Sequence, residues 1–273
     1  MTSDSNSPRS AIESAKRTIA IERQAVEQLE DRIDDSFSKA VDLLASVDGR
    51  VIVSGMGKSG HIGNKIAATL ASTGTPAQFV HPAEACHGDM GMVTRSDAAL
   101  LMSNSGTTSE ITALLPLLKR LGIPIVAMTG NANSTLATAA DVHLNIGVPE
   151  EACPLDLAPT ASTTANLVMG DALAIALLEQ RGFTAEDFAF SHPGGALGRR
   201  LLTRVSDVLV TGSDVPRVTT DTSLADALME ISAKGLGMST VVDANGHLLG
   251  IFTDGDLRRA LEQKHDLSTT QVG

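Results

Sequence analysis

The sequence has 273 residues, enough for about two domains, and 42% of them are hydrophobic. It contains no Trp and no Tyr, so the predicted core is aliphatic. With 21 basic and 32 acidic residues the formal net charge is −11, which argues against nucleic acids and anionic membranes as partners. An anionic ligand would have to be held by local hydrogen-bond donors. The two cysteines argue against a disulfide framework and favour a reducing compartment.

No stretch has the pattern of a signal peptide or a membrane span. Residues 1–9 are polar and lack the apolar core of a signal peptide. The most apolar helical stretch, residues 163–178, contains Asp171 and is shorter than the about 20 residues that a span needs. These patterns predict a cytoplasmic protein.

The first 45 residues predict a disordered segment followed by a helix. Residues 1–8 are rich in serine. From residue 10 to residue 45 apolar residues recur every three or four positions, which predicts a long amphipathic helix, broken near Asp34 and Asp35. Such a helix could pad the first domain or form a subunit interface, and padding is the simpler interpretation.

Strands and helices alternate between residues 51 and 147. The expected strands are 51–54, 77–80, 98–103, 123–128 and 142–146, and the expected helices are 60–72, 108–121 and 133–140. This alternation predicts an α/β fold, a doubly wound parallel sheet with helices on both faces. In such sheets ligands bind beyond the carboxyl ends of the strands.

Two turns rich in glycine and hydroxyl groups follow the first and third of these strands. Residues 54–61 (Ser-Gly-Met-Gly-Lys-Ser-Gly-His) and 103–110 (Ser-Asn-Ser-Gly-Thr-Thr-Ser-Glu) each join a strand to a helix. Glycines permit tight backbone turns, and helix N-termini offer free N–H groups to anions. The two turns together predict a site for a small sugar phosphate.

Two nucleotide-binding motifs fit these turns less well. Residues 54–59 lack the first glycine of a nucleoside-triphosphate loop. Gly55, Gly57 and Gly60 do match the Gly-x-Gly-x-x-Gly pattern of dinucleotide sites, but residues 71–78 contain no carboxylate where such a site needs one. The hydroxyl-rich second turn would also have no role there.

Two more loops follow predicted strands, at residues 81–88 and 148–154. Four loops are therefore expected to converge at one edge of the sheet, since the carboxyl ends of parallel strands share an edge. Each loop is a candidate part of the site.

The first domain is expected to end with two helices and a loop. A long apolar helix should run over residues 160–181, and a shorter one should begin at Thr184, with Asp187 completing a capping box. Residues 191–198, dense in Gly and Pro, are expected to form a loop that closes the domain at about residue 202.

Residues 204–266 predict a small α+β unit with the order helix, strand, helix, strand, strand, helix. The last two strands, residues 239–242 and 248–252, are joined by Asp-Ala-Asn-Gly, a hairpin signal. Asp254 and Asp256 are expected to cap the last helix.

These stretches resemble those of a known family. The matching residues are 57–63, 71–76, 87–89, 91–93, 103–106, 151–155, 157–160, 191–198 and 252–259. Residues 1–202 resemble a sugar isomerase (SIS) domain, and residues 203–273 resemble a first cystathionine-β-synthase (CBS) motif. Together they are similar to the arabinose-5-phosphate isomerases. The resemblance implies interconversion of D-ribulose 5-phosphate and D-arabinose 5-phosphate, feeding Kdo and lipopolysaccharide synthesis, by a homotetramer.

The resemblance also implies four catalytic residues. Aldose–ketose isomerisation needs a base, a proton carrier for the two oxygens, and stabilisation of the enediolate. Glu151 is expected to move the proton between C1 and C2, and His192 to open the furanose ring and serve the oxygens. Lys58 would stabilise charge on oxygen, and Glu110 would orient Lys58 or the sugar hydroxyls.

Each of these residues has a structural alternative. Glu110 would lie in the first turn of a helix, where the dipole favours a carboxylate in any case. Glu151 could be an ordinary surface charge, and Lys58 a solvated loop residue. His192, which precedes Pro-Gly-Gly, could simply shape a turn.

The resemblance implies a wider set of substrate contacts: Ser59, Gly74, Thr75, His81, His87, Ser103, Asn104, Ser105, Thr107 and Thr108. No cofactor is expected. His81 is the candidate for binding an inhibitory Zn²⁺, although its spacing from Cys86 and His87 is loose for a ligand set. Neither Cys86 nor Cys153 is expected to act as a nucleophile, since the reaction needs none.

The family usually carries two CBS motifs, and this sequence ends at residues 269–273, where a second would begin. Either the sequence is partial or the pair forms between subunits. The expected CBS ligand is a nucleotide or sugar nucleotide. Two other functions stay open: a sugar-phosphate-sensing SIS regulator, which would need a DNA-binding helix-turn-helix, and a paralogous isomerase of sugar-alcohol catabolism, which would share these motifs.

Overall fold

The computed structural model describes residues 10–273, so the expectation of disorder at residues 1–8 lies outside them. The chain divides into two compact units, one ending at Leu202 and the other beginning at Thr203. Each unit has its own apolar core.

The first unit is built on a five-stranded sheet with the order β2-β1-β3-β4-β5, and every neighbouring pair is parallel. The strands are β1 (Val51–Gly55), β2 (Ala77–Phe79), β3 (Ala98–Met102), β4 (Ile125–Thr129) and β5 (Val142–Asn145). The predicted doubly wound parallel sheet is confirmed.

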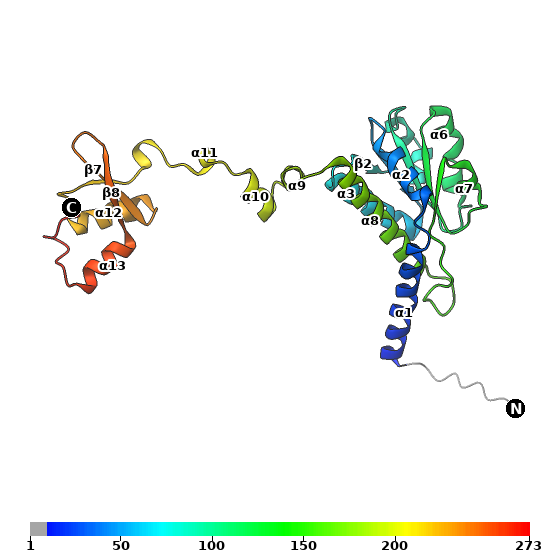
Figure 1. Ribbon diagram of the computed structural model, residues 1–273, viewed down its shortest axis with the longest axis horizontal. Helices are drawn as coiled ribbons and strands as arrows, with labels where there is room; N and C mark the ends of the chain where they lie inside the picture. Colours follow the sequence, from blue (N-terminus) through cyan, green and yellow to red (C-terminus); the bar gives the residue numbers. More distant parts are fainter. Residues whose placement is uncertain (1–9) are drawn as a thin grey trace. The chain divides into compact units, whose positions relative to one another are not determined.

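Helices cover both faces of this sheet (Figure 1). One face carries α2 (Asp35–Ala45), α3 (Gly57–Ser72) and α8 (Ala161–Arg181); the other carries α4 (Pro82–Cys86), α5 (Ser109–Thr112), α6 (Leu115–Leu121) and α7 (Thr135–Ala139). Leu100 of β3 packs on the first face and Leu101 on the second. Because alternate side chains enter two cores, every residue of β3 is buried.

The N-terminal helix is divided, as predicted. It consists of α1 (Ala11–Glu30), opened by a capping box of Ser10 and Glu13, and α2. The break falls at Asp34, whose side chain accepts the N–H of Ser36 at 2.8 Å and so caps α2.

The long apolar helix α8 belongs to the core of the first unit. Among the described helices it alone has the length and composition of a possible membrane span, yet half of its apolar window is buried inside the fold. Its buried face, with Met169, Leu173 and Leu177, packs on the same core as β1 and β3. Burial against a sheet explains the apolar composition without a membrane.

The second unit contains a three-stranded sheet with the order β6-β7-β8. Its elements are α11 (Val205–Val208), η2 (Gly212–Asp214), β6 (Arg217–Thr219), α12 (Leu224–Lys234), β7 (Met238–Val242), β8 (Leu248–Thr253) and α13 (Asp254–Glu262). The predicted hairpin joins β7 and β8, and Asp256 forms a capping box with Thr253 at the start of α13.

Two expected loops are partly helical. Residues 81–88 contain α4, because Pro82 fits the first turn of a helix, and a short 3₁₀ turn, η1 (Asp89–Met92), follows. Only the middle of residues 191–198 is a loop, since Ser191 ends α9 (Ala185–Ser191) and Ala196 begins α10 (Ala196–Leu202).

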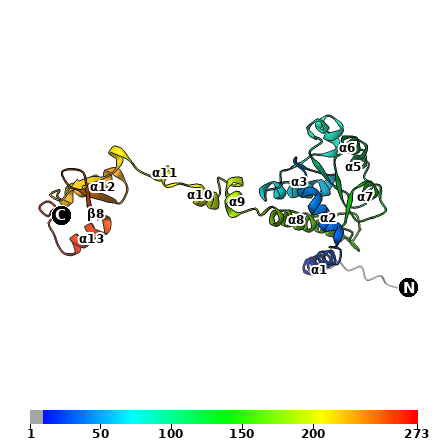
Figure 2. The same cartoon turned by 45° about the horizontal axis from the view of Figure 1, so that its top comes forward.

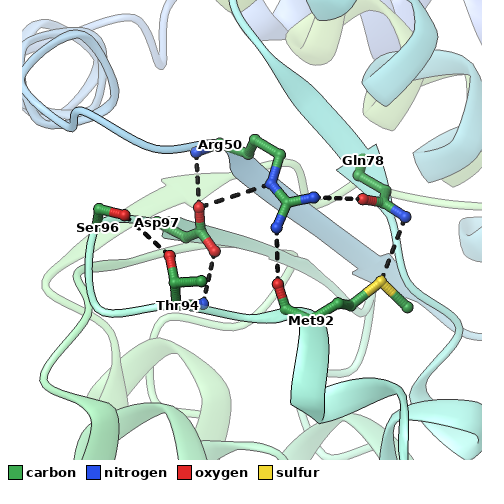
Figure 3. A network of polar contacts seen from close by, with 6 residues as sticks. All are labelled: Arg50, Gln78, Met92, Thr94, Ser96 and Asp97. Atoms are coloured by element: carbon green, nitrogen blue, oxygen red, sulfur yellow. Dashed lines mark hydrogen bonds and ion pairs between the residues drawn. The ribbon is translucent and has the colours of Figure 1, made fainter.

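Polar contacts close the amino edge of the first sheet (Figure 3). Asp97, which is 1% exposed, accepts the backbone N–H groups of Arg50 and Thr94, both at 2.7 Å. The Arg50 guanidinium donates to Gln78 and to the carbonyl of Met92. These contacts tie the starts of β1 and β3 to β2 and η1, and they leave little polar capacity for a ligand.

Candidate active site

The site begins at the switch point of the sheet. β1 lies between β2 and β3, and Gly55 pairs with Met102, so β1 and β3 end side by side. The chain leaves β1 for one face of the sheet and β3 for the other, which opens a crevice between the two turns.

The turn after β1 depends on its glycines. A Cβ on Gly60 would lie 2.5 Å from the carbonyl oxygen of Gly55, and Gly57 has a φ of +57°. The backbone can therefore pass closely into the first turn of α3 only with these residues. The tight turn leaves Lys58 exposed and Ser59 half-buried at the carboxyl edge.

The turn after β3 is held by its own hydroxyl groups. Ser103 Oγ lies 2.7 Å from Thr108 Oγ1 and accepts the N–H of Gly106 at 3.1 Å. Gly106 has a φ of +67°, and a Cβ there would lie 2.0 Å from Ser134 Oγ. With the turn fixed in this way, Asn104, Ser105 and Thr107 are exposed donors at the rim.

His81 follows β2 and lines a cavity of about 280 Å³ together with Gly57, Gly60, His61, Asn64 and Phe79. Its Nδ1 atom is buried and has no hydrogen-bond partner within the described chain. Ser54 anchors the preceding residue by donating to the carbonyl of Val80 at 2.7 Å. A buried ring nitrogen without a partner is suited to a polar ligand. His87 is exposed, at the end of α4.

Glu110 lies in the first turn of α5, as expected. The hydroxyl of Ser109 donates to its carboxylate at 2.7 Å. That hydrogen bond, the N–H of Glu110 itself and the charge of His81 hold the pKa of Glu110 below its usual value. Helix α4, which follows β2, contacts α5, which follows β3, so these two segments are neighbours.

Glu151 is a partly buried helix cap and not an ordinary surface charge. Its Oε2 accepts the N–H of Thr160 at 2.6 Å, the hydroxyl of Thr160 at 2.8 Å and the N–H of Ser162 at 3.3 Å. Burial alone would raise the pKa of Glu151, but the hydrogen bonds from Ser162 and Thr160 outweigh it and lower the pKa. The carboxylate is therefore ionised near neutral pH, the form that a base requires.

The packing of α3 against α8 places Glu151 and Lys58 at the same end of the two helices. Helices α3 and α8 run in the same direction, because Lys65 bonds to Asp171 near the middle of both, and Gly74, just past α3, lies against Phe183, just past α8. The same offset places the first turn of α3, with Lys58, beside the start of α8, where Glu151 is bound. Both helix N-termini lie at the carboxyl edge of the sheet, and their dipoles favour an anion there.

Three predicted site residues lie elsewhere in the same chain. Gly74 and Thr75 precede β2 and so lie at the amino edge, where Phe183 covers Gly74 and Thr75 is 1% exposed. His192 follows the far end of α8, beside α9, where its ring stacks on that of Phe188 with the centroids 4.1 Å apart. Within one chain these three residues are separated from the turns at the carboxyl edge. Sequence patterns alone did not indicate this separation.

No group of three or more His, Cys, Asp or Glu residues suited to a metal lies within residues 10–273. A Zn²⁺ at His81 would need ligands from elsewhere. Sequence reasoning also missed the part played by Thr160, which holds Glu151 at the start of α8. The signal was available in the hydroxyl-rich residues 160–164 that open an apolar helix.

Comparison with known proteins identifies the family of both units. A SIS domain model matches residues 43–176 and a CBS domain model matches residues 205–263. The arabinose 5-phosphate isomerase KdsD of Pseudomonas aeruginosa is 66% identical over 261 residues, 96% of this chain and 80% of that protein. KdsD of Escherichia coli K12 is 57% identical over 260 residues, 95% of this chain and 79% of that protein.

Among solved structures, E. coli CFT073 c3406 in complex with arabinose 5-phosphate has a TM-score of 0.65 and 46% identity, covering 67% of this chain and 97% of that one. Fold and site thus define a SIS-domain enzyme of the sugar-phosphate isomerase class, with a CBS domain attached. Within that class the chain belongs to the arabinose 5-phosphate isomerase family.

Proposed function

We propose that this protein interconverts D-ribulose 5-phosphate and D-arabinose 5-phosphate through an enediol. The observation that carries the proposal is the meeting of Lys58, Glu110 and the Ser103–Thr108 turn at the carboxyl edge, beside the helix start that binds Glu151. Family membership supplies the identity of the sugar. The product is suited to Kdo and lipopolysaccharide synthesis in the cytoplasm.

The hydroxyl-rich turn holds the phosphate, with Asn104, Ser105 and Thr107 as exposed donors and Ser59 opposite them. Glu151 takes the proton from C2 of arabinose 5-phosphate and returns it to C1. A carboxylate in this position contributes about 10²–10⁴-fold to such a step. Lys58 stabilises the enediolate oxygen, because an ammonium group next to developing negative charge is worth more away from bulk water.

The remaining catalytic group, His192, comes from a second copy of the chain. Helix α8 has 21 residues and is about 30 Å long, with Glu151 at its start and His192 beyond its end. Helix α9 has seven residues, or about 10 Å, which is too short to return His192 to the start of α8. Figures 1 and 2 show α9 beyond the end of α8.

A homotetramer would bring the two ends together. Gly74 lies at the same edge as the end of α8, so its backbone could approach a neighbour's substrate together with His192. The side chain of Phe190 in α9 is 72% exposed, and an apolar groove of about 190 Å³ runs between α1 and α8. Both features suit contact with another subunit.

The reaction moves a proton within one sugar and needs no external oxidant or reductant, so no cofactor is proposed. Zn²⁺ would act as an inhibitor by occupying the unpartnered ring nitrogen of His81. In the second unit a nucleotide or sugar nucleotide is the proposed CBS ligand.

The test is incubation of purified protein with ribulose 5-phosphate and separation of the products. Arabinose 5-phosphate should form and ribose 5-phosphate should not. Formation of ribose 5-phosphate, or of neither aldose, would contradict the proposal.

A further inference from the structure

Helix α1 is tied to the segment that carries Glu151. Arg32, just beyond α1, donates to the carbonyl of Gly147, and Arg17 Nη2 donates to the carbonyl of Ala152 at 2.9 Å. In the other direction, Thr164 in the first turn of α8 donates to Glu22 Oε2 at 3.0 Å. These bonds join parts of the chain more than 100 residues apart. Padding of the domain alone does not require them.

Arg17 makes the contact nearest to Glu151. The Ala152 that it binds is 3% exposed, so the guanidinium satisfies a carbonyl that water reaches poorly. Arg17 Nε is itself buried and has no partner within the described chain. Arg17 is half-buried, and its guanidinium is held by the carbonyl of Ala152.

A chain of hydrogen bonds links Arg17 to the carboxylate of Glu151 through the Ala152 peptide and the Thr160 hydroxyl. The N–H of Ala152 donates to Thr160 Oγ1 at 2.8 Å, and that hydroxyl donates to Glu151 Oε2 at 2.8 Å. Three hydrogen bonds, from the N–H and the hydroxyl of Thr160 and from the N–H of Ser162, hold Oε2 of Glu151. This arrangement anchors the carboxylate at the start of α8 through Oε2.

We propose that Arg17 is a positioning residue that fixes the orientation of Glu151 for proton transfer. The inference rests on the proposed role of Glu151 as the base. Arg17 binds the carbonyl of Ala152, and Thr160 accepts its N–H, so both peptide groups of Ala152 are fixed. Because Glu151 directly precedes Ala152, the direction of its side chain is fixed as well. Catalytic groups must stay within about 0.5 Å of the productive position, and a displacement of about 1 Å can cost about 10²-fold in rate.

The matched control is Arg23, which lies on the same helix. Its side chain is 71% exposed and pairs with Glu27 in the next turn, away from the loop. Arg17→Ala should lower kcat about 10- to 100-fold with a small change in KM, because substrate binding does not depend on the orientation of Glu151. Arg23→Ala should leave kcat and KM as in the unchanged protein. Circular dichroism and thermal melts of both variants report whether the chain is folded.

Chemical rescue separates positioning from folding. Added guanidinium should restore part of the kcat of Arg17→Ala, and Arg17→Lys should retain more activity than Arg17→Ala, since an ammonium still donates to the Ala152 carbonyl. A kcat for Arg17→Ala equal to that of Arg23→Ala would overturn the inference. So would a loss of activity that follows the loss of folded protein and does not respond to guanidinium.

Glu151→Gln, measured in parallel, shows which proposal has failed. If Glu151→Gln keeps its activity, the proposed base is wrong. If Glu151→Gln is inactive and Arg17→Ala is fully active, the base stands and only the role of Arg17 falls. In the Glu151→Gln background the Arg17→Ala change should have no further effect on kcat, because residues that act as a unit are not additive.

Discussion

The two edges of the SIS sheet are made from the same five strands but use polar residues in opposite ways. At the amino edge, Arg50 and Thr94 both donate to the buried carboxylate of Asp97 (Figure 3). At the carboxyl edge, Lys58 and Ser105 are exposed, and a buried nitrogen of His81 has no partner within the described chain. Thr75 Oγ1 at the amino edge is also buried without a partner within the described chain, so the contrast lies in exposure. The amino edge is tied together by its own buried side chains, whereas the carboxyl edge presents exposed donors to a ligand.

The comparison also explains why one chain does not hold the whole proposed site. Gly74 and His192 belong to the amino edge and to the end of α8, although the resemblance assigns them to the substrate. In the proposed assembly, this edge of one subunit contributes to the site of a neighbour. The following changes test the two edges separately, beginning with the largest expected effect.

At the carboxyl edge, Glu151→Gln should lower kcat about 10²–10⁴-fold, because an amide cannot accept the C2 proton. Arabinose 5-phosphate should still bind, as measured by calorimetry. Glu150→Gln is the control, since Glu150 is the exposed neighbour. Activity of Glu151→Gln close to that of Glu150→Gln would remove the base assignment.

At the amino edge, Asp97→Asn should destabilise the SIS unit by about 1–3 kcal/mol, because an amide has one acceptor oxygen and leaves one backbone N–H without a partner. The refolded protein should keep its kcat. Asp171→Asn breaks the exposed pair with Lys65 and should cost less than about 1 kcal/mol in the same denaturant melts. Equal effects of the two changes would contradict the division between the edges.

The contribution of the Asp97 carboxylate should also appear in the pH dependence of the free energy of unfolding. Burial would raise the pKa of Asp97, but hydrogen bonds from Arg50 and Thr94 outweigh it and lower the pKa below the usual 3.8. A lowered pKa means that the stabilisation is present above about pH 4 and is lost as the pH falls through the lowered value. Asp97→Asn should therefore flatten the acid limb of the stability curve, measured from about pH 5 downward.

Ser105→Ala should raise KM about 3- to 10-fold with little change in kcat, since one donor to the phosphate is lost in the ground state and the transition state alike. The substitution is at an exposed position of the turn, so the fold should be unchanged in thermal melts. A lower kcat at constant KM would mean that this turn takes part in the chemistry and not only in binding.

Removal of residues 203–273 should have the smallest effect on the site. The chain divides between Leu202 and Thr203, and the strand-end turns all belong to the first unit. The shortened chain should keep kcat within a few-fold while losing any response to nucleotides. Loss of activity in a folded, shortened chain would show that the CBS unit contributes to the site.

Much of the fold followed from local patterns in the sequence. The apolar runs within the predicted strands 98–103 and 123–128 indicated buried parallel strands, observed as β3 and β4, and a break near Asp34 and Asp35 was predicted between α1 and α2. The side of the sheet on which each turn lies follows from strand direction. For this reason Lys58 and the Ser103–Thr108 turn were expected together.

What local patterns could not give is the set of contacts made across long separations. Arg17 looks like any charged residue on the polar face of an amphipathic helix, and its partner Ala152 lies 135 residues away. The capping of α8 by Glu151 likewise depends on a loop that returns to the helix start. The place of His192 depends on the length and direction of α8, which fix its distance from Glu151 only in three dimensions.

The most direct test of the account is complementation between two inactive variants. Glu151→Gln and His192→Ala are each purified, then unfolded together and refolded as mixed oligomers. If Glu151 of one copy and His192 of another form each site, random mixing should restore about a quarter of the full activity, because about one site in four has both groups intact. If both groups of a site come from one chain, every site stays defective and the mixture remains inactive, which would contradict the shared site.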